Sequence, residues 1–249
     1  MSSNEEFCGF WEVVFKLIVQ LKNQIMGKQF FKPFKGQKYD EGICGKRVLV
    51  LGASFYCNKN GQNGQRNCPF FAECTDPVKK DSSKFDTTCS EYAGKNLKLS
   101  EEPTNAINEC YTAYKRFAVF MQQFVSDKSY DVWDRMAFTD YLQFFSPTTQ
   151  TKKEYLTQRD FDAFIETLQE LKPDVVISWG TAIVEEIREK NPYVIDKDKL
   201  SETDWYVCHM NVPKVQHEIT LVSCYHPASI KYWYGDLKLF EKHLRSVLK

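Results

Sequence analysis

The segment VLVLGASFYC, residues Val48 to Cys57, carries the clearest structural signal in the chain. Its apolar run stops at Gly52, and Ser54, Phe55 and Tyr56 follow almost at once. A strand that is apolar on both faces belongs in the middle of a sheet that is covered on both sides. A glycine followed by polar and aromatic residues marks the point where such a strand gives way to a loop. The segment therefore predicts a buried strand whose carboxyl end presents a serine and an aromatic pair.

Outward from this segment, apolar strands alternate with helical patterns. Further strands are predicted in DRMAFTDYL (134–142), DVVISWG (174–180) and EITLVSCYHPAS (218–229). Apolar residues at helical spacing predict helices over 4–26, 104–125, 161–171, 182–189 and 237–248. Thr157 and Asp160 have the spacing of a capping box before the third of these. The alternation indicates a three-layer α/β/α sandwich with a short central parallel sheet.

The chain shows neither an internal repeat nor a clear boundary, so residues 1–249 are predicted to form a single domain. Within it, residues 1–40 are interpreted as an N-terminal helix and a basic linker that pack on the α/β core. Residues 53–102 are polar, contain four cysteines and form a long insertion. Segments of this length in a compact domain are usually functional or cross-linked.

Composition excludes several classes of protein. The chain has 249 residues and 43% hydrophobic content, which suits a packed core and not disorder. Lys+Arg and Asp+Glu balance at 33 each, so DNA contact would need a local basic surface. The apolar stretch FWEVVFKLIVQL (10–21) is interrupted by Glu12 and Lys16, which argues against a signal peptide or a membrane span. We therefore expect a cytoplasmic protein with reduced thiols, monomeric and without membrane contact.

Ligands of open parallel sheets bind beyond the carboxyl ends of the strands. The second predicted strand ends in Thr139 and Asp140, and the last runs into Tyr225 and His226. Together with the group after Gly52, these ends offer aromatic surfaces, a carboxyl group and a histidine. Such a set suits a flat, polar heterocycle, whose face is stacked and whose edge is read by hydrogen bonds.

Four motifs of the chain occur in the order seen in the uracil-DNA glycosylase superfamily: LGASFYC, FTDY, VVISWGTAIVEEI and HPAS. Residues 40–249 resemble that superfamily. The resemblance implies that the protein flips a base out of single- or double-stranded DNA and hydrolyses its N-glycosidic bond. His226 is then the residue that stabilises the departing base, and Asp140 stands where an Asn that reads the base edge is expected. The implied base-holding residues are Gly52, Ala53, Phe55 and Tyr56, and the implied DNA-contacting residues are Ser229, Ile230 and Lys231.

The chain also departs from the superfamily pattern. Members carry an acidic or amide side chain in the loop after the first strand, where this chain has Ala53 and Ser54, so Ser54 at best orients water. An ionised Asp140 can only accept hydrogen bonds, which favours a base with an exocyclic amine over uracil. A catalytically silent nucleic-acid or nucleotide-binding protein therefore remains an alternative. A serine hydrolase built on Ser54 and His226 is a weaker one, because no G-x-S-x-G motif is present.

Four cysteines of the insertion are spaced C-x10-C-x5-C-x14-C: Cys57, Cys68, Cys74 and Cys89. None of the gaps has the tight spacing that is typical of structural zinc sites. A metal would nevertheless order a loop that has few apolar residues. A zinc or iron–sulfur centre and ordinary reduced thiols both stay open. The other five cysteines are expected to be small buried residues.

Overall fold

The computed structural model describes residues 29, 31–54, 112–126, 131–143, 151, 153–196, 207–229 and 237–249. A six-stranded sheet with the order β1-β3-β2-β4-β6-β5 forms its centre. The four central strands run parallel, and the two edge strands are antiparallel to their neighbours. The strands are β1 (Phe34–Lys35), β2 (Val48–Gly52), β3 (Met136–Asp140), β4 (Val175–Trp179), β5 (Val207–Met210) and β6 (Ile219–Cys224).

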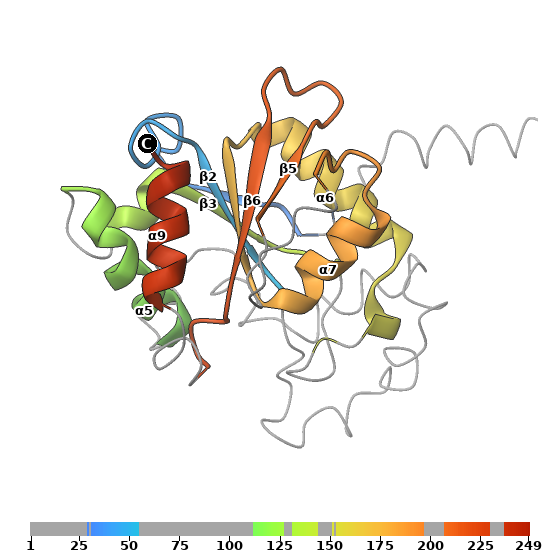
Figure 1. Ribbon diagram of the computed structural model, residues 1–249, viewed down its shortest axis with the longest axis horizontal. Coiled ribbons are helices and arrows are strands. Elements are labelled where there is room, and N and C mark those ends of the chain that lie inside the picture. The colour runs from blue at the N-terminus through green and yellow to red at the C-terminus, as the bar shows by residue number, and fades with distance from the viewer. Residues whose placement is uncertain are drawn as a thin grey trace, which may run out of the picture.

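Helices cover both faces of this sheet (Figure 1). The helices α5 (Thr112–Met121) and α9 (Leu237–Val247) lie on one face, and α6 (Gln158–Leu171) and α7 (Thr181–Lys190) lie on the other. Short 3-10 helices span Gln122–Phe124, Asp131–Arg135 and Lys153–Tyr155. The predicted mixed α/β fold with a largely parallel sheet is therefore confirmed for this part of the chain.

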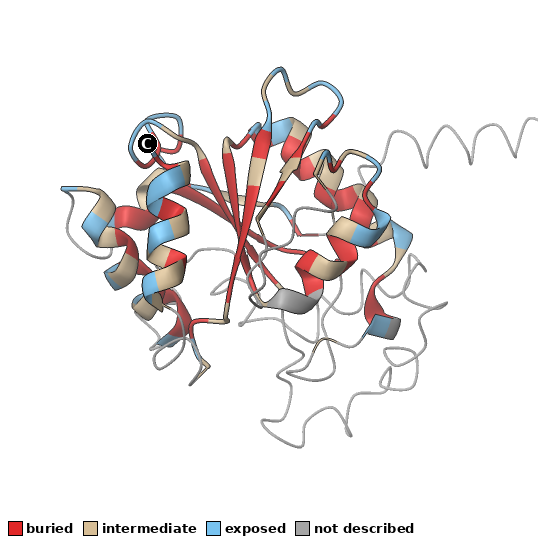
Figure 2. Cartoon of the chain, viewed as in Figure 1, coloured by how far each residue is buried: buried red, intermediate tan, exposed pale blue. Residues whose placement is uncertain are grey.

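The strands β2, β3 and β4 are buried along their whole length, and β6 is buried except at Thr220 (Figure 2). Side chains alternate between two hydrophobic cores, because successive strand residues face opposite sides. Val48 and Val50 contribute to the core under α5 and α9, whereas Leu49 and Leu51 contribute to the core under α6 and α7. The apolar run that begins at Val48 thus supplies both cores at once, as expected for a strand covered on both sides.

Several sequence-based expectations need correction at the sheet edges. Both antiparallel edge strands were missed by the sequence analysis. The basic segment lies against the core from Phe31 onward, and Tyr39 in it and Ile43 just beyond it are fully buried. Cys44 is exposed, so the expectation that it is buried was wrong, whereas Cys208 and Cys224 are buried. The predicted helix over 4–26, the start of the predicted helix at 104–111 and the insertion from residue 55 onward lie outside the described residues.

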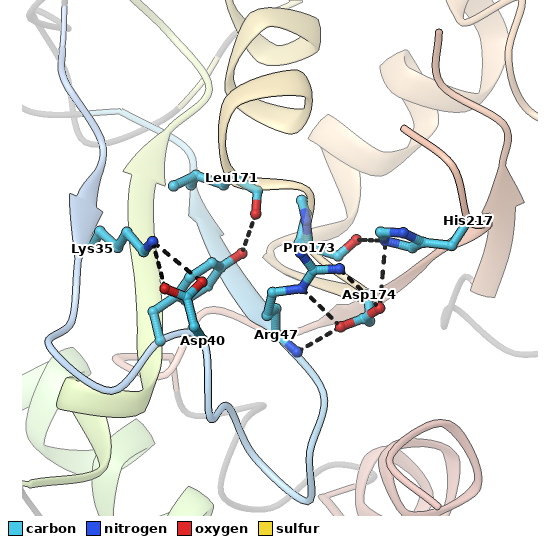
Figure 3. Close-up of polar contacts among 8 residues, drawn as sticks. Lys35, Asp40, Arg47, Leu171, Pro173, Asp174 and His217 are labelled. Carbon is cyan, nitrogen blue, oxygen red and sulfur yellow. Dashed lines mark hydrogen bonds and ion pairs between the residues drawn. The ribbon is translucent and has the colours of Figure 1, made fainter. Parts of the chain in front are cut away.

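A polar cluster joins the amino ends of β2 and β4 (Figure 3). The backbone N–H of Arg47 donates to Asp174 Oδ2 over 2.8 Å, and the Arg47 guanidinium lies against the same carboxyl. The side chain of His217 lies 3.4 Å from Asp174 Oδ1 and hydrogen-bonds the Pro173 carbonyl. Partial burial alone would raise the pKa of Asp174, but the Arg47 hydrogen bonds and the nearby charges of Arg47 and His217 lower it below its usual value. This cluster fixes the sheet at the edge opposite the candidate site.

Within the residues described above, no helix has both the length and the apolar character that crossing a membrane requires.

Candidate functional site at the carboxyl edge of the sheet

The carboxyl ends of the parallel strands form one row across the sheet. Gly52 pairs with Asp140, and Trp179 pairs with Cys224. Leu51 pairs with Ser178, which places Gly52 beside Trp179 and completes the row. All four strands end at the lower edge of the sheet as drawn in Figure 1. The residues predicted at the ends of three separate strands therefore share this edge.

The row faces the side of the sheet that α5 and α9 cover. On β3, Met136 and Phe138 belong to this side, so Asp140, two residues further on, lies there as well. Trp179 belongs to the same core, and its ring centroid lies 5.5 Å from that of Phe138. Two buried aromatic rings thus form an apolar floor directly behind the carboxyl end of the row.

Gly52 is required by the carboxyl group beside it. A Cβ at this position would lie 2.0 Å from Asp140 Oδ1 and 3.1 Å from Phe138 Cζ. Real Cβ atoms do not approach other heavy atoms that closely. The carboxyl of Asp140 therefore leans over β2 into the space that any larger residue would fill, which explains the glycine at the end of this strand.

Asp140 holds its carboxyl group out of water, and no described residue forms an ion pair with it. The residue is 4% exposed, and no hydrogen bond to its carboxyl comes from the described residues. Burial raises the pKa of Asp140 to about 8, because an ionised carboxylate loses its hydration there. At neutral pH the group is mostly a carboxylic acid.

This protonation state corrects the expectation that Asp140 only accepts hydrogen bonds. A neutral carboxylic acid has one O–H donor and retains acceptor capacity. It therefore offers the same pair of functions as the amide of an asparagine. The argument against a uracil-like edge, which assumed an ionised Asp140, does not hold in this environment.

His226 is held by a tight turn after β6. The backbone N–H of Ser229 donates to the His226 carbonyl over 2.8 Å, and the N–H of Ala228 donates to His226 Nδ1 over 3.2 Å. Arg116 on α5 donates to the carbonyl of Pro227 over 3.3 Å. The imidazole meets the ring of Trp179 edge to face, with 5.6 Å between the centroids. The turn and the indole together fix the position of the ring.

The contacts of His226 also fix its tautomer. Since Nδ1 accepts a hydrogen bond from the Ala228 N–H, the hydrogen of the neutral ring is on Nε2. Burial lowers the pKa of His226, because the charged imidazolium is disfavoured away from water. At neutral pH the side chain is an uncharged donor at Nε2.

The two polar groups lie over neighbouring strands of the row. The carboxyl of Asp140 lies over Gly52 on β2, and the imidazole of His226 lies beside Trp179 on β4. The strands β2 and β4 are hydrogen-bonded neighbours. Adjacent strands are about 4.8 Å apart, so the strands over which the two groups lie are near neighbours at this edge.

Ser54 and Ala53 follow Gly52 along the same edge. Ser54 is buried, and no described residue provides a hydrogen-bond partner for its Oγ. The Ser–His hydrogen bond that activates a serine nucleophile is therefore not formed with His226, which argues against the serine hydrolase. Ala53 packs against the core under α6 and α7. Neither side chain supplies a carboxylate.

The loop after β3 is held from the other helical layer. Asp160 and Thr157 form the predicted capping box at the start of α6. The same carboxyl accepts a hydrogen bond of 2.7 Å from the backbone N–H of Gln143, whose side-chain amide donates to the carbonyl of Asp140 over 2.9 Å. The start of α6 thereby anchors the segment that carries Asp140.

Sequence reasoning missed Trp179 as a site residue. It is 2% exposed, touches the His226 ring, and has an indole N–H that finds no hydrogen-bond partner among the described residues. A buried N–H without a partner is uncommon, so this donor is available to a ligand or to water. The signal was present in the sequence as a tryptophan at the carboxyl end of a central strand.

Other predicted site residues are not placed. Phe55, Tyr56, Ile230 and Lys231 lie outside the described residues, as do the four insertion cysteines proposed as metal ligands. Ser229 is described, and its backbone closes the His226 turn. Among the described residues, no group of three or more His, Cys, Asp or Glu side chains is arranged to hold a metal ion.

The chain matches no protein-family model and no curated protein sequence.

Proposed function

We propose that the protein binds a flipped base of DNA at this edge and hydrolyses its N-glycosidic bond, in the manner of the uracil-DNA glycosylases. The observation that carries the proposal is that Asp140 and His226 lie at the ends of separate parallel strands along one edge, beside the buried rings of Phe138 and Trp179, which contact each other. Two uncharged hydrogen-bonding groups on an apolar floor suit an uncharged heterocycle. In such surroundings a hydrogen bond to developing charge is stronger than in water.

In the proposed reaction, the bond between the sugar C1′ and the base nitrogen breaks, and its electron pair leaves with the base. A water oxygen forms the new bond to C1′, and the proton that this water loses balances the charge of the departing base. His226 donates from Nε2 to the base oxygen on which negative charge builds. A neutral Asp140 does not repel that charge, whereas a carboxylate would.

The remaining roles follow from the sequence resemblance. Phe55 and Tyr56 stack on the base, and Ser54 orients the attacking water. Ser229, Ile230 and Lys231 contact the DNA, with Ile230 filling the gap that the flipped base leaves. The fold proposed for the whole chain is that of the uracil-DNA glycosylases, and the insertion cysteines remain candidates for a zinc or iron–sulfur centre.

A second candidate is a nucleic-acid or nucleotide-binding protein without catalysis. It is favoured by the residues after Gly52, since Ala53 and Ser54 supply no carboxylate that would activate water or stabilise a sugar cation. Binding of a base would need only the edge-reading groups and the apolar floor.

An excision panel separates the two candidates. Oligonucleotides, single- and double-stranded, carry uracil, hypoxanthine, xanthine or an oxidised pyrimidine, and release of the base is measured with the protein in excess. We expect slow release of at least one base and faster release by Ser54→Asp. If neither protein releases any base while base-dependent binding persists, the glycosylase proposal fails and the binding protein is supported.

A further inference from the structure

Asp140 is a buried acid that no group of the described chain satisfies. Its Oδ1 occupies the space over Gly52, the ring of Phe138 lies beside the same space, and its carboxyl receives no hydrogen bond from the described residues. Burying a carboxyl group without partners is costly, and more so when it is charged. A polar group kept in this way at the carboxyl edge of a sheet is best explained by a ligand that completes its hydrogen bonds.

No charged neighbour accounts for the state of this acid. The described titratable groups on the elements around it are Lys32 before β1, Tyr114, Lys115 and Arg116 on α5, Tyr141 after β3, Cys224 and His226 at the end of β6, and Asp160 on the other face of the sheet. The ends of β2 and β4 contribute Gly52, Ser54 and Trp179, which do not titrate. Burial is the cause of the raised pKa, and none of these groups offsets it.

We propose that Asp140 reads the base as a neutral carboxylic acid, with one oxygen donating and the other accepting, and thereby selects bases whose edge carries a donor beside an acceptor in either order. This inference rests on the proposed function, because it assumes that a base lies at this edge. It replaces the narrower expectation of a base with an exocyclic amine.

The breadth of the selection follows from the chemistry of the acid. Uracil and the 6-oxopurines present a ring N–H beside a carbonyl, whereas cytosine and adenine present a ring nitrogen acceptor beside an amine. The proton of a carboxylic acid can reside on either oxygen, so both orders are matched without turning the side chain over. An ionised carboxylate accepts at both oxygens and matches neither order fully.

The test is the pH dependence of base-specific binding by the full-length protein. The probes are single-stranded oligonucleotides with one 2′-fluoroarabino uracil or cytosine nucleotide, in which the fluorine suppresses cleavage. An otherwise identical oligonucleotide with a tetrahydrofuran abasic site gives the backbone contribution, which is subtracted at constant salt. A third probe carries 3-methyluracil, whose ring nitrogen has lost its donor.

We expect the base-specific affinity for both uracil and cytosine to fall about tenfold between pH 6 and pH 9, because an acid with a pKa of about 8 is almost fully neutral at pH 6 and mostly ionised at pH 9. The Asp140→Asn variant keeps a donor and an acceptor but cannot ionise, so the Asp140-dependent fall is absent. Any effect of the base's own ionisation is the same in both proteins. The 3-methyluracil probe should bind no better than the abasic one.

The outcomes distinguish a failure of the inference about Asp140 from a failure of the proposed function. Base-specific affinity that is constant or rises from pH 6 to pH 9, or equal binding of 3-methyluracil, overturns the inference while base binding stands. A wild-type protein that neither prefers a base over the abasic site at any pH nor releases one overturns the proposed function as well. The wild-type pH profile and the methylated probe decide the matter even if Asp140→Asn does not fold.

Discussion

Replacing Asp140 by Asn should stabilise the protein, by an amount that depends on pH. In the native state the pKa of Asp140 is about 8, against 3.8 for an unperturbed carboxyl. A raised pKa means that the folded protein binds the proton more tightly than the unfolded chain does. The contribution of protonated Asp140 to the free energy of unfolding is therefore intact below the pKa of the unfolded state and falls as the pH rises toward the pKa of the folded state. Each pH unit in this window costs wild type about 1.4 kcal/mol. The loss reaches about 4 kcal/mol at pH 7 and levels off above pH 8.

The assay is urea denaturation of both proteins at pH 4, 5, 6, 7 and 9, because Asn has nearly the same shape and cannot ionise. We expect the two free energies of unfolding to be similar at pH 4 and to diverge by about 4 kcal/mol at pH 7, with the variant the more stable. Asp131→Asn, at an exposed position, serves as the matched control and should follow wild type at every pH. Two parallel pH profiles for wild type and Asp140→Asn would refute the reasoning, because they would mean that Asp140 ionises normally in the folded protein.

Three further substitutions test the surrounding packing. Gly52→Ala should cost about 1–3 kcal/mol of unfolding free energy, since its Cβ would meet Asp140 Oδ1. The cost should be smaller in a protein that also carries Asp140→Ala. Denaturation of wild type, both single variants and the double variant measures this coupling, and purely additive costs would contradict the contact. Thr157→Ala should lower stability by about 1 kcal/mol through loss of the capping box, seen as a lower Tm, and an unchanged Tm would count against that cap. The lowered pKa of Asp174 stabilises the fold above the pKa of the unfolded state, and this stabilisation is lost as the pH falls through the pKa of the folded state. Asp174→Asn should therefore be less stable than wild type at pH 7, with a smaller difference in acid. A destabilisation of equal size at both pH values would argue against the ion pair.

The central architecture was predictable because few signals compete with it in the sequence. The strand that ends at Gly52 is apolar on both faces and stops at a glycine. The capping residues at the start of α6 indicate where that helix begins. Both signals are local. Once the strands alternate with helices, parallel pairing brings their carboxyl ends to one edge, so the positions of Asp140 and His226 followed from topology.

The edges of the sheet and the state of the site were beyond local signals. The strand Phe34–Lys35 has only two residues, and its pairing with β3 is a long-range contact that no short pattern reveals. The edge strand Val207–Met210 alternates buried and half-buried residues and carries a histidine, which weakens its apolar pattern. The protonation of Asp140 depends on its burial beside Phe138 and over Gly52, and sequence alone could not supply that environment.

The most direct test of the central claim is the rate of base release by wild type and His226→Ala under single-turnover conditions. The account predicts slow release of a base by wild type at pH 7 and a rate about 10²–10³ lower in His226→Ala, because one preorganised donor to the departing base is lost. DNA binding should change little, and His243→Ala on α9 should match wild type. Equal rates of release for wild type and His226→Ala, or no release of any base by wild type and Ser54→Asp, would contradict it.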